Sequence, residues 1–327
     1  VNISISLIIY FLFKPPLKAR LSYLKISSNK KDSSLKSLEI FILSSFALSG
    51  LAALVYQVAW TRILSLLLGS SVYAFSLILS VFILGLALGT VTASRFLDSL
   101  SDLVKSYGLV QIMIGFSSLV IIPIFGYIPF VNRWIYENWS QQFQFMQGAN
   151  FLIIFGLLII PTFFMGAQFP IVIKMLAKKL ETLGQNVGRV YASNTIGAII
   201  GSFLAGFILI PTLGLQTTIL SVVFLNVFWG IILLAWGASI GFNWKMYVLP
   251  GVFILSVVIA NSIAPWDKSV ISSGSFMPYR IGDLREAELK KNKILYFKEG
   301  MHTTVTTELS TSGNIYLRVN GKTDASL

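Results

Sequence analysis

The chain has 327 residues, of which 55% are hydrophobic and only 12% are charged. Soluble domains contain about 25% charged residues, so this composition excludes a large water-soluble fold. The chain has no cysteine, which excludes disulfides, thiolate metal sites and cysteine nucleophiles. The formal net charge is +12, and in a membrane protein such an excess marks cytoplasmic loops. Because nucleic-acid binding needs a clustered basic face on a soluble domain, we expect no nucleic-acid partner.

Residues 1–37 are expected to form an N-terminal region with two parts. Residues 1–13 are apolar but too few to span a bilayer, so we expect them to lie on the membrane surface or against a partner. Residues 14–37 contain several lysines and one arginine against a single acidic residue, Asp32. This composition predicts a cytoplasmic arm near anionic lipid headgroups.

A transmembrane helical domain is predicted over residues 38–264, because a helical crossing takes about 20 apolar residues. Proline and glycine within the fourth stretch predict a kinked or broken helix there. Between the third and fourth stretches, aromatic and polar residues alternate over residues 131–148, as in a helix that lies in the membrane interface. We count seven crossings, at residues 38–60, 72–96, 107–130, 149–176, 190–210, 215–236 and 246–264.

The distribution of lysine and arginine predicts the orientation. With the basic arm in the cytoplasm, most basic residues near the ends of the crossings fall on the cytoplasmic side, and only Arg62 and Arg133 fall outside. This asymmetry favours a cytoplasmic N-terminus, and we expect a bacterial inner-membrane protein. Seven crossings then place the C-terminal tail outside the cytoplasm, whereas one miscounted crossing would place it inside.

The pattern changes from helical to alternating after residue 264. Residues 265–293 are predicted to be a linker with a short helix at 283–291. Strand composition at residues 294–298, 303–309 and 315–320, with a glycine-containing loop between the last two, predicts a β-hairpin module. Three strands alone are marginally stable. We therefore expect residues 294–327 to be the truncated start of a larger soluble domain.

Polar side chains at membrane depth are the candidates for a site. Such groups either form hydrogen bonds between helices or contact a transported solute. No carboxylate lies clearly in the middle of a crossing, so we expect no proton-relay acid. His302 is the only histidine and has no cysteine and few acidic neighbours, so we expect no metal site. The intramembrane polar candidates are Gln57, Gln168, Asn194 and Asn226.

Small residues recur at four-residue spacing in two of the crossings. This spacing places them on one helix face, where they let two backbones approach closely. Because they lie inside apolar helices, we interpret them as packing residues and not as a phosphate-binding loop. The predicted helix-packing residues are Gly85, Gly89, Gly197 and Gly201.

Several blocks of sequence resemble membrane-bound spermidine synthase-like proteins. They are residues 48–90, 163–176, 187–215, 264–274, 294–306 and 317–326. The resemblance implies a membrane region comparable with half of a major facilitator transporter, followed by an aminopropyltransferase-like domain. In the soluble enzymes that domain begins with a small β-sheet and continues into a Rossmann-like fold, which binds decarboxylated S-adenosylmethionine and a polyamine.

The chain departs from the soluble enzymes within the matching strands. Asp324 takes the place of a glutamine that lies near the nucleotide in those enzymes, and residues around His302 and Thr303 replace a Tyr-Gln pair. The resemblance also implies that the Rossmann part is missing. We therefore expect no catalysis by this chain alone and no cofactor, with decarboxylated S-adenosylmethionine bound only if the missing domain is supplied.

Three functions follow as hypotheses. The first is an integral membrane anchoring or assembly protein that resembles the membrane part of a spermidine synthase-like protein. The second is a transporter-like protein for a polyamine or another small solute. The third is a fragment of a membrane-bound aminopropyltransferase. The expected partners are the lipid bilayer and either a membrane-complex partner or a chain that carries the Rossmann domain.

Overall fold

The computed structural model describes residues 30–139, 142–176, 183–237, 242–274, 276 and 293–327. The predictions for residues 1–29 and for a helix at 283–291 lie outside these ranges. The chain divides into two compact units, Val1–Ile42 and Leu43–Leu327. The second unit contains most of the helices and the C-terminal strands.

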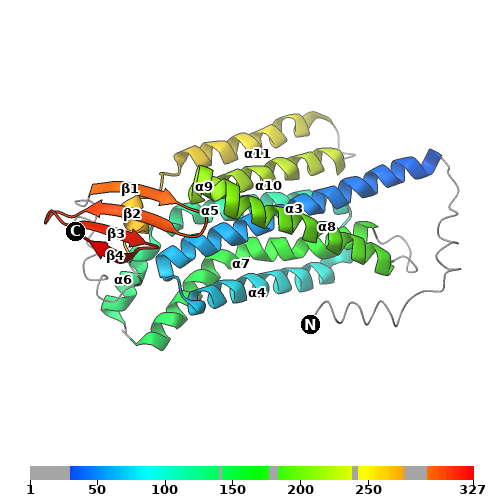
Figure 1. The fold of residues 1–327 in the computed structure, drawn as a ribbon. Coiled ribbons are helices and arrows are strands. Elements are labelled where there is room, and N and C mark those ends of the chain that lie inside the picture. The colour runs from blue at the N-terminus through cyan, green and yellow to red at the C-terminus, as the bar shows by residue number, and fades with distance from the viewer. Residues whose placement is uncertain (1–29, 140–141, 177–182, 238–241, 275, 277–292) are drawn as a thin grey trace, which may run out of the picture. The chain divides into compact units, whose positions relative to one another are not determined.

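Long helices make up most of the described chain (Figure 1). Within the described residues, six helical segments are long and apolar enough to cross a membrane. They are α3 (Lys30–Leu68), α4 (Val72–Phe96), α5 (Leu103–Phe125), α7 (Phe143–Leu176), α8 (Leu183–Phe203) with its continuation to Leu213, and α10 (Leu215–Gly237). A further helix, α11 (Phe242–Ser262), lies where the seventh crossing is predicted, and its apolar part Pro250–Ser262 is shorter than a span.

Two proline-containing regions turn out differently from each other. The third predicted crossing ends as helix α5 at Phe125, and the short helix α6 (Ile128–Asn138) begins with Pro129 in its first turn. The fourth crossing is predicted to be kinked or broken; α7 is one uninterrupted helix, so the break does not occur, and the kink stays a prediction. Pro161 and Pro170 are both buried within it. Neighbouring helices therefore hold the backbone in place where proline removes a hydrogen bond.

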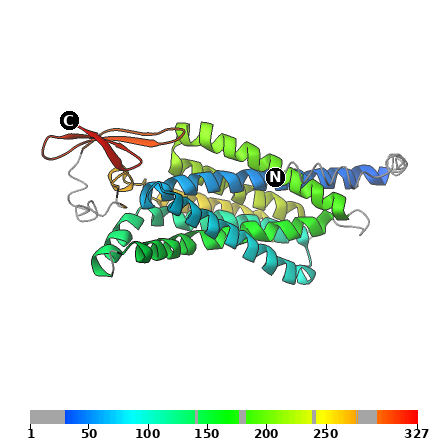
Figure 2. The same ribbon diagram turned by 60° about the horizontal axis from the view of Figure 1, so that its bottom comes forward.

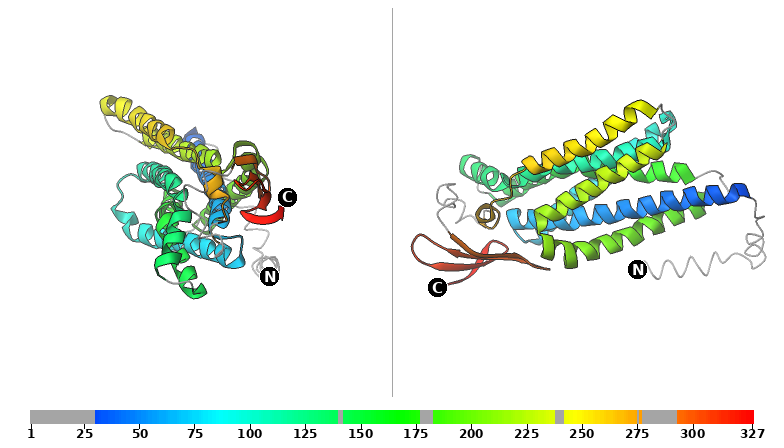
Figure 3. Two further views of the ribbon diagram at one scale, coloured as in Figure 1. Left: turned by 90° about the vertical axis from the view of Figure 1, so that its left-hand side faces the viewer. Right: turned by 90° about the horizontal axis from the view of Figure 1, so that it is seen from above.

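Glycines bring α3, α4, α7 and α8 into close contact. A Cβ atom added to Gly89 would lie 1.8 Å from the carbonyl oxygen of Phe163, and one added to Gly197 would lie 1.8 Å from that of Ala47. A Cβ atom added to Gly85 would likewise overlap the Thr162 side chain, and one added to Gly201 would overlap the Leu51 carbonyl oxygen. Views from two directions show α3 and α8 side by side (Figures 1 and 3).

The end of α8 is irregular and leads into α10. Helix α8 continues through a π-helical segment, η3 (Leu204–Leu209), into the short helix α9 (Ile210–Leu213). Gly214 then has φ 83°, a left-handed conformation that favours glycine. This sharp end lets α10 begin at the very next residue.

The C-terminal residues form a four-stranded antiparallel sheet in the order β1-β2-β3-β4. Strands β1 (Lys293–Glu299), β2 (Thr304–Leu309) and β3 (Ile315–Val319) lie where strands are predicted. Strand β4 (Lys322–Ser326) is a correction to the predicted hairpin module. Its polar sequence lacks the usual strand composition, but Asn320 and Gly321 have φ 49° and 78°, which makes a tight turn that returns the chain along β3.

The sheet lies at one end of the helices (Figure 2). A buried ion pair joins two of its strands. Arg318 Nη1 on β3 donates to Glu308 Oε1 on β2 at 2.9 Å, and both side chains are 2% exposed. On the path from α11 to β1, the short helix α12 (Lys268–Ile271) is capped by Asp267, whose carboxylate accepts from the Ser269 N–H.

Candidate functional site

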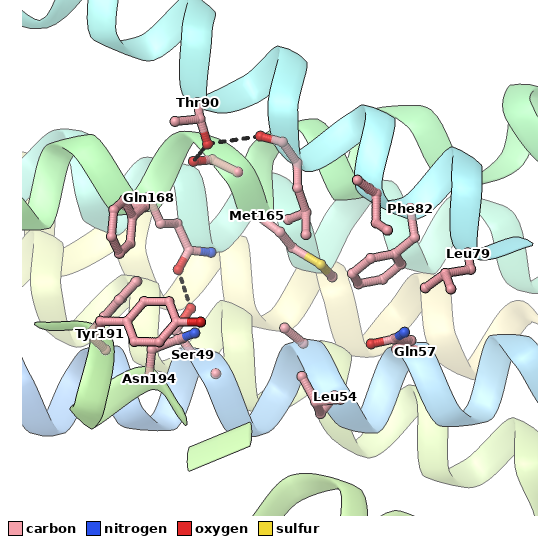
Figure 4. A pocket seen from close by; sticks show the side chains of 17 residues that line it. Ser49, Leu54, Gln57, Leu79, Phe82, Thr90, Met165, Gln168, Tyr191 and Asn194 are labelled. Atoms are coloured by element: carbon pink, nitrogen blue, oxygen red, sulfur yellow. Dashed lines mark hydrogen bonds between the residues drawn. The ribbon is translucent and has the colours of Figure 1, made fainter. Parts of the chain in front are cut away.

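A cavity of about 420 Å³ lies between α3, α4, α7 and α8 (Figure 4). It brings together three of the predicted polar side chains, Gln57, Gln168 and Asn194. The fourth, Asn226, is buried on α10 and does not line this cavity. The cavity therefore joins residues that are far apart in the sequence but lie on four neighbouring helices.

The polar groups lie toward two ends of the cavity. Ser49 and Gln57 are eight residues apart on α3, which corresponds to about 12 Å along the helix axis. Figure 4 shows Gln168 and Asn194 near Ser49, whereas Gln57 lies further along, beyond Leu54. Gly50 lets Asn194 approach α3 at the first end, because a Cβ atom there would lie 2.6 Å from Asn194 Oδ1 and would also overlap the Asn194 backbone oxygen.

The hydrogen bonds at the cavity do not use all of its amide groups. Ser49 Oγ donates to Gln168 Oε1. Thr90 Oγ1 donates to the backbone oxygens of Leu86 and Gly166 at 2.8 and 2.9 Å, so it links α4 to α7. In the described part of the chain, the Gln57 amide and the Gln168 nitrogen have no hydrogen-bond partner. These two amides are therefore available to a bound molecule.

The lining is uncharged. Its polar groups are amides and hydroxyls, and the described side chains that line the cavity include no aspartate, glutamate, lysine, arginine or histidine. The remaining lining is aliphatic or aromatic, with Phe46, Phe82, Phe169 and Tyr191 among it. A few polar groups in a mostly apolar cavity are the usual composition of a small-molecule site.

A second group of polar residues lies where the helices meet the sheet. Arg62, near the end of α3, donates to the carbonyl oxygens of Met301 and of Gly300, the latter at 2.7 Å. Glu299, at the end of β1, accepts from the Leu215 N–H at 2.8 Å and so caps α10. Burial raises the pKa of Glu299, opposed by the hydrogen bond from Leu215 and by the charges of Arg62 and Lys268.

The chain after α11 is fixed at the same place. The indole N–H of Trp266 donates to the Ile122 carbonyl at 2.8 Å, and its backbone N–H donates to Gln216 Oε1 at 2.9 Å. The ammonium group of Lys268 lies 5.2 Å from the centre of the Phe297 ring, within the range of a cation–π interaction. We call the contacts of Arg62, Glu299, Trp266 and Lys268 the junction.

The sequence does not indicate most of the residues at the cavity and at the junction. Ser49 and Thr90 resemble ordinary small polar residues of an apolar helix, and Glu299 has no motif around it. Arg62 is predicted only as a basic residue outside the cytoplasm, and nothing in its neighbourhood indicates a contact with a turn more than two hundred residues later.

The remaining predicted residues lie on the sheet. Asp324 is exposed on β4, and His302 is exposed between β1 and β2. In the part of the chain that the structure describes, no group of three or more histidine, cysteine, aspartate or glutamate residues is placed to hold a metal.

The chain is similar to curated proteins named polyamine aminopropyltransferase. It is 29% identical over 171 residues to one from Leptospira interrogans, covering 50% of this chain and 29% of that protein. It is 22% identical over 278 residues to one from Oceanobacillus iheyensis, covering 84% of this chain and 48% of that protein. It is 24% identical to polyamine aminopropyltransferase 2 of Streptomyces coelicolor, covering 54% of this chain and 30% of that protein. The relatives support a spermidine synthase-like family.

This relationship agrees with the resemblance found in the sequence blocks. The chain spans at most about half the length of the curated relatives it matches. No protein-family model and no solved structure matches it.

Proposed function

We propose that the chain is an integral membrane protein that anchors a spermidine synthase-like sheet to the end of a helical bundle. The observation that carries this proposal is the junction. Arg62 from α3 binds the turn after β1, and Glu299 from β1 caps α10. A sheet attached through a loop alone would not need these contacts with two separate helices.

The proposed topology has seven crossings in a half-facilitator-like bundle, with a cytoplasmic N-terminus in a bacterial inner membrane. Helix α10 begins beside the sheet, where Glu299 caps it. Trp266, which follows α11, binds Gln216 in the first turn of α10. Helix α11 therefore returns the chain over the length of α10, which supports a crossing by α11 and a sheet outside the cytoplasm.

The proposed domain limits are those of the sequence: an N-terminal region to residue 37, the helical domain over 38–264, a linker over 265–293 and the sheet module over 294–327. The name of the relatives is the basis for proposing that the whole protein is a polyamine aminopropyltransferase. In this proposal the sheet contributes no catalysis alone. Decarboxylated S-adenosylmethionine binds to a Rossmann domain supplied by the same protein or by a partner.

Alkaline carbonate extraction tests the membrane part of the proposal, and limited trypsin digestion tests the anchoring. The chain is expected to remain in the membrane pellet, and the sheet is expected to resist cleavage at Lys293 and Lys298. In an Arg62→Gln variant those sites become cleavable, while an Arg95→Gln control, altered at the exposed end of α4, behaves as the parent. Release by carbonate, or equal cleavage in all three chains, contradicts the proposal.

A second candidate function is movement of a small solute through the bundle. The observation that favours it is the cavity, which holds Gln57, Gln168 and Asn194 among four crossing helices. Uptake of labelled spermidine and of labelled uncharged solutes into proteoliposomes tests it. Uptake that falls in a Gln168→Leu variant supports the candidate, and no uptake of any solute eliminates it.

A further inference from the structure

We propose that the cavity between α3, α4, α7 and α8 binds an elongated, uncharged molecule that enters from the bilayer and has a hydrogen-bonding group at each end. This inference rests on the proposed insertion of the helices into a membrane. It does not depend on the junction or on catalysis, and it assigns to the helical domain a ligand that anchoring does not require.

The positions of the open amides define the two polar ends. At one end Gln57 presents an amide that has no partner among the described residues, and the Gln168 nitrogen presents a donor at the other. Ser49, which binds Gln168, is about 12 Å from Gln57 along α3. A single small polar molecule reaches only one of these groups, so a molecule that satisfies both is elongated.

The middle of the cavity suits a hydrocarbon chain. Figure 4 shows Leu54 and Met165 between the two polar ends, and Phe82 across the cavity from Gln57. Ala53, one turn before Gln57 on α3, adds only a methyl group to the lining. A molecule with methylene or ring groups between its polar ends keeps apolar surface against apolar surface here.

The lack of charge selects against a polyamine. An ammonium group moved from water into an apolar site without a carboxylate partner is strongly disfavoured. The described side chains that line this cavity supply no carboxylate. Hydroxyl, carbonyl and amide groups, by contrast, pair well with the glutamine side chains, which both donate and accept hydrogen bonds.

The rim of the cavity indicates the route of entry. Ile83 on α4 is 55% exposed and Tyr191 on α8 is 65% exposed, and both line the cavity. Both also lie within helices long and apolar enough to cross a membrane. In a bilayer their exposed surface faces lipid, so molecules dissolved in the membrane reach this rim of the cavity.

Photolabelling in lipid nanodiscs tests this inference with the full chain. The probe is a 1,10-decanediol derivative with a diazirine at the middle of the chain, and labelled residues are mapped by mass spectrometry. Labelling is expected to concentrate at Leu54 and Met165. Unlabelled 1,10-decanediol competes, whereas 1,10-diaminodecane, which has the same length with a charge at each end, is expected to compete more than about tenfold less well.

Two variants and a control identify the polar ends. Gln57→Leu and Gln168→Leu are each expected to lower probe affinity about fivefold, the loss of one hydrogen bond. Gln57 makes no hydrogen bond in the described structure, so its variant folds even if loss of the Ser49 contact disturbs the Gln168 variant. Asn226→Leu removes a buried amide outside the cavity and is expected to leave labelling unchanged.

Several results would overturn the inference. One is labelling at Leu54 and Met165 that is no stronger than at Leu152, which is 68% exposed on α7. Equal competition by the diamine, or full labelling of Gln57→Leu, would also do so. Carbonate extraction of the cell membranes from which the chain is prepared separates this failure from failure of membrane insertion, because a chain that remains in the membrane pellet but takes up no probe in nanodiscs contradicts the binding site alone.

Discussion

The cavity and the junction use polar residues in opposite ways. At the junction, the charged groups of Arg62 and Glu299 are bound to backbone groups of the opposite element. In the cavity, the polar groups are neutral, and the amides of Gln57 and Gln168 keep unused hydrogen-bonding capacity. The contrast supports the proposals that the junction attaches the sheet and that the cavity receives another molecule.

The largest effect is expected from closing the helix contact beside the cavity. In Gly89→Ala the added methyl group would lie 1.8 Å from the Phe163 carbonyl oxygen, so α4 and α7 must separate. We expect a loss of about 3 kcal/mol in the free energy of unfolding, as for overpacked cores. Gly156→Ala on α7, where an added Cβ meets nothing within 4 Å, is the control. Thermal unfolding in detergent measures both, and equal melting temperatures would contradict the close approach.

The next largest effect is expected at the junction. Arg62→Gln removes hydrogen bonds to two carbonyls and leaves Glu299 half-buried without that positive charge. We expect a loss of about 2 kcal/mol in the protection of β1 and β2, from a charged hydrogen bond. Hydrogen–deuterium exchange of residues 293–309 measures it, with Arg95→Gln as the control. Unchanged exchange in Arg62→Gln would show that the sheet is held by other contacts.

A pH dependence is expected from Glu299. Burial raises the pKa of Glu299 in the folded protein, so the folded state holds this proton more tightly than the unfolded state. The resulting contribution to the free energy of unfolding is complete below the ordinary pKa of a glutamate. That contribution is lost as the pH rises through the raised value. Glu299→Gln retains an acceptor for the Leu215 N–H and has no such titration.

The measurement is the melting temperature of the parent and of Glu299→Gln as a function of pH. The parent is expected to fall relative to the variant as the pH rises from about 4 to about 8. A parent that gains stability relative to the variant over this range would show that the charges of Arg62 and Lys268 outweigh burial.

The smallest effect on stability is expected in the cavity. Gln57→Leu removes an amide that has no hydrogen-bond partner in the described part of the chain. We expect a change of less than about 0.5 kcal/mol, of either sign, because no protein hydrogen bond is lost. The same substitution is expected to weaken probe binding. Strong destabilisation by Gln57→Leu would mean that this amide is structural and not part of a binding site.

The sequence predicts the helices well because each depends mainly on its own apolar length. Residues 72–96 are predicted as a crossing and form α4 with the same bounds. Strand β4 is missed because its pairing depends on the turn at Asn320 and Gly321 and not on strand composition. The sequence leaves a kink or a break open in α7, and the helix is not broken because Pro161 and Pro170 are buried, which no local pattern reveals.

The candidate site is only partly predictable for the same reason. Polar residues inside apolar stretches stand out, so Gln57, Gln168 and Asn194 are found from the sequence. Which of them meet depends on how α3, α7 and α8 pack, and Asn226 stands out equally but lies elsewhere. The junction is invisible in the sequence because it joins Arg62 to backbone oxygens, which carry no residue signature.

Single-cysteine labelling tests the central claim, a membrane-embedded bundle with the sheet at its outer end. Because the chain has no cysteine, Ser326→Cys on β4 and Ser101→Cys between α4 and α5 each give one reporter. Both positions are exposed. A membrane-impermeant maleimide is expected to label Ser326→Cys in intact cells and Ser101→Cys only after lysis. Labelling of both in intact cells, or the reverse pattern, would contradict the account.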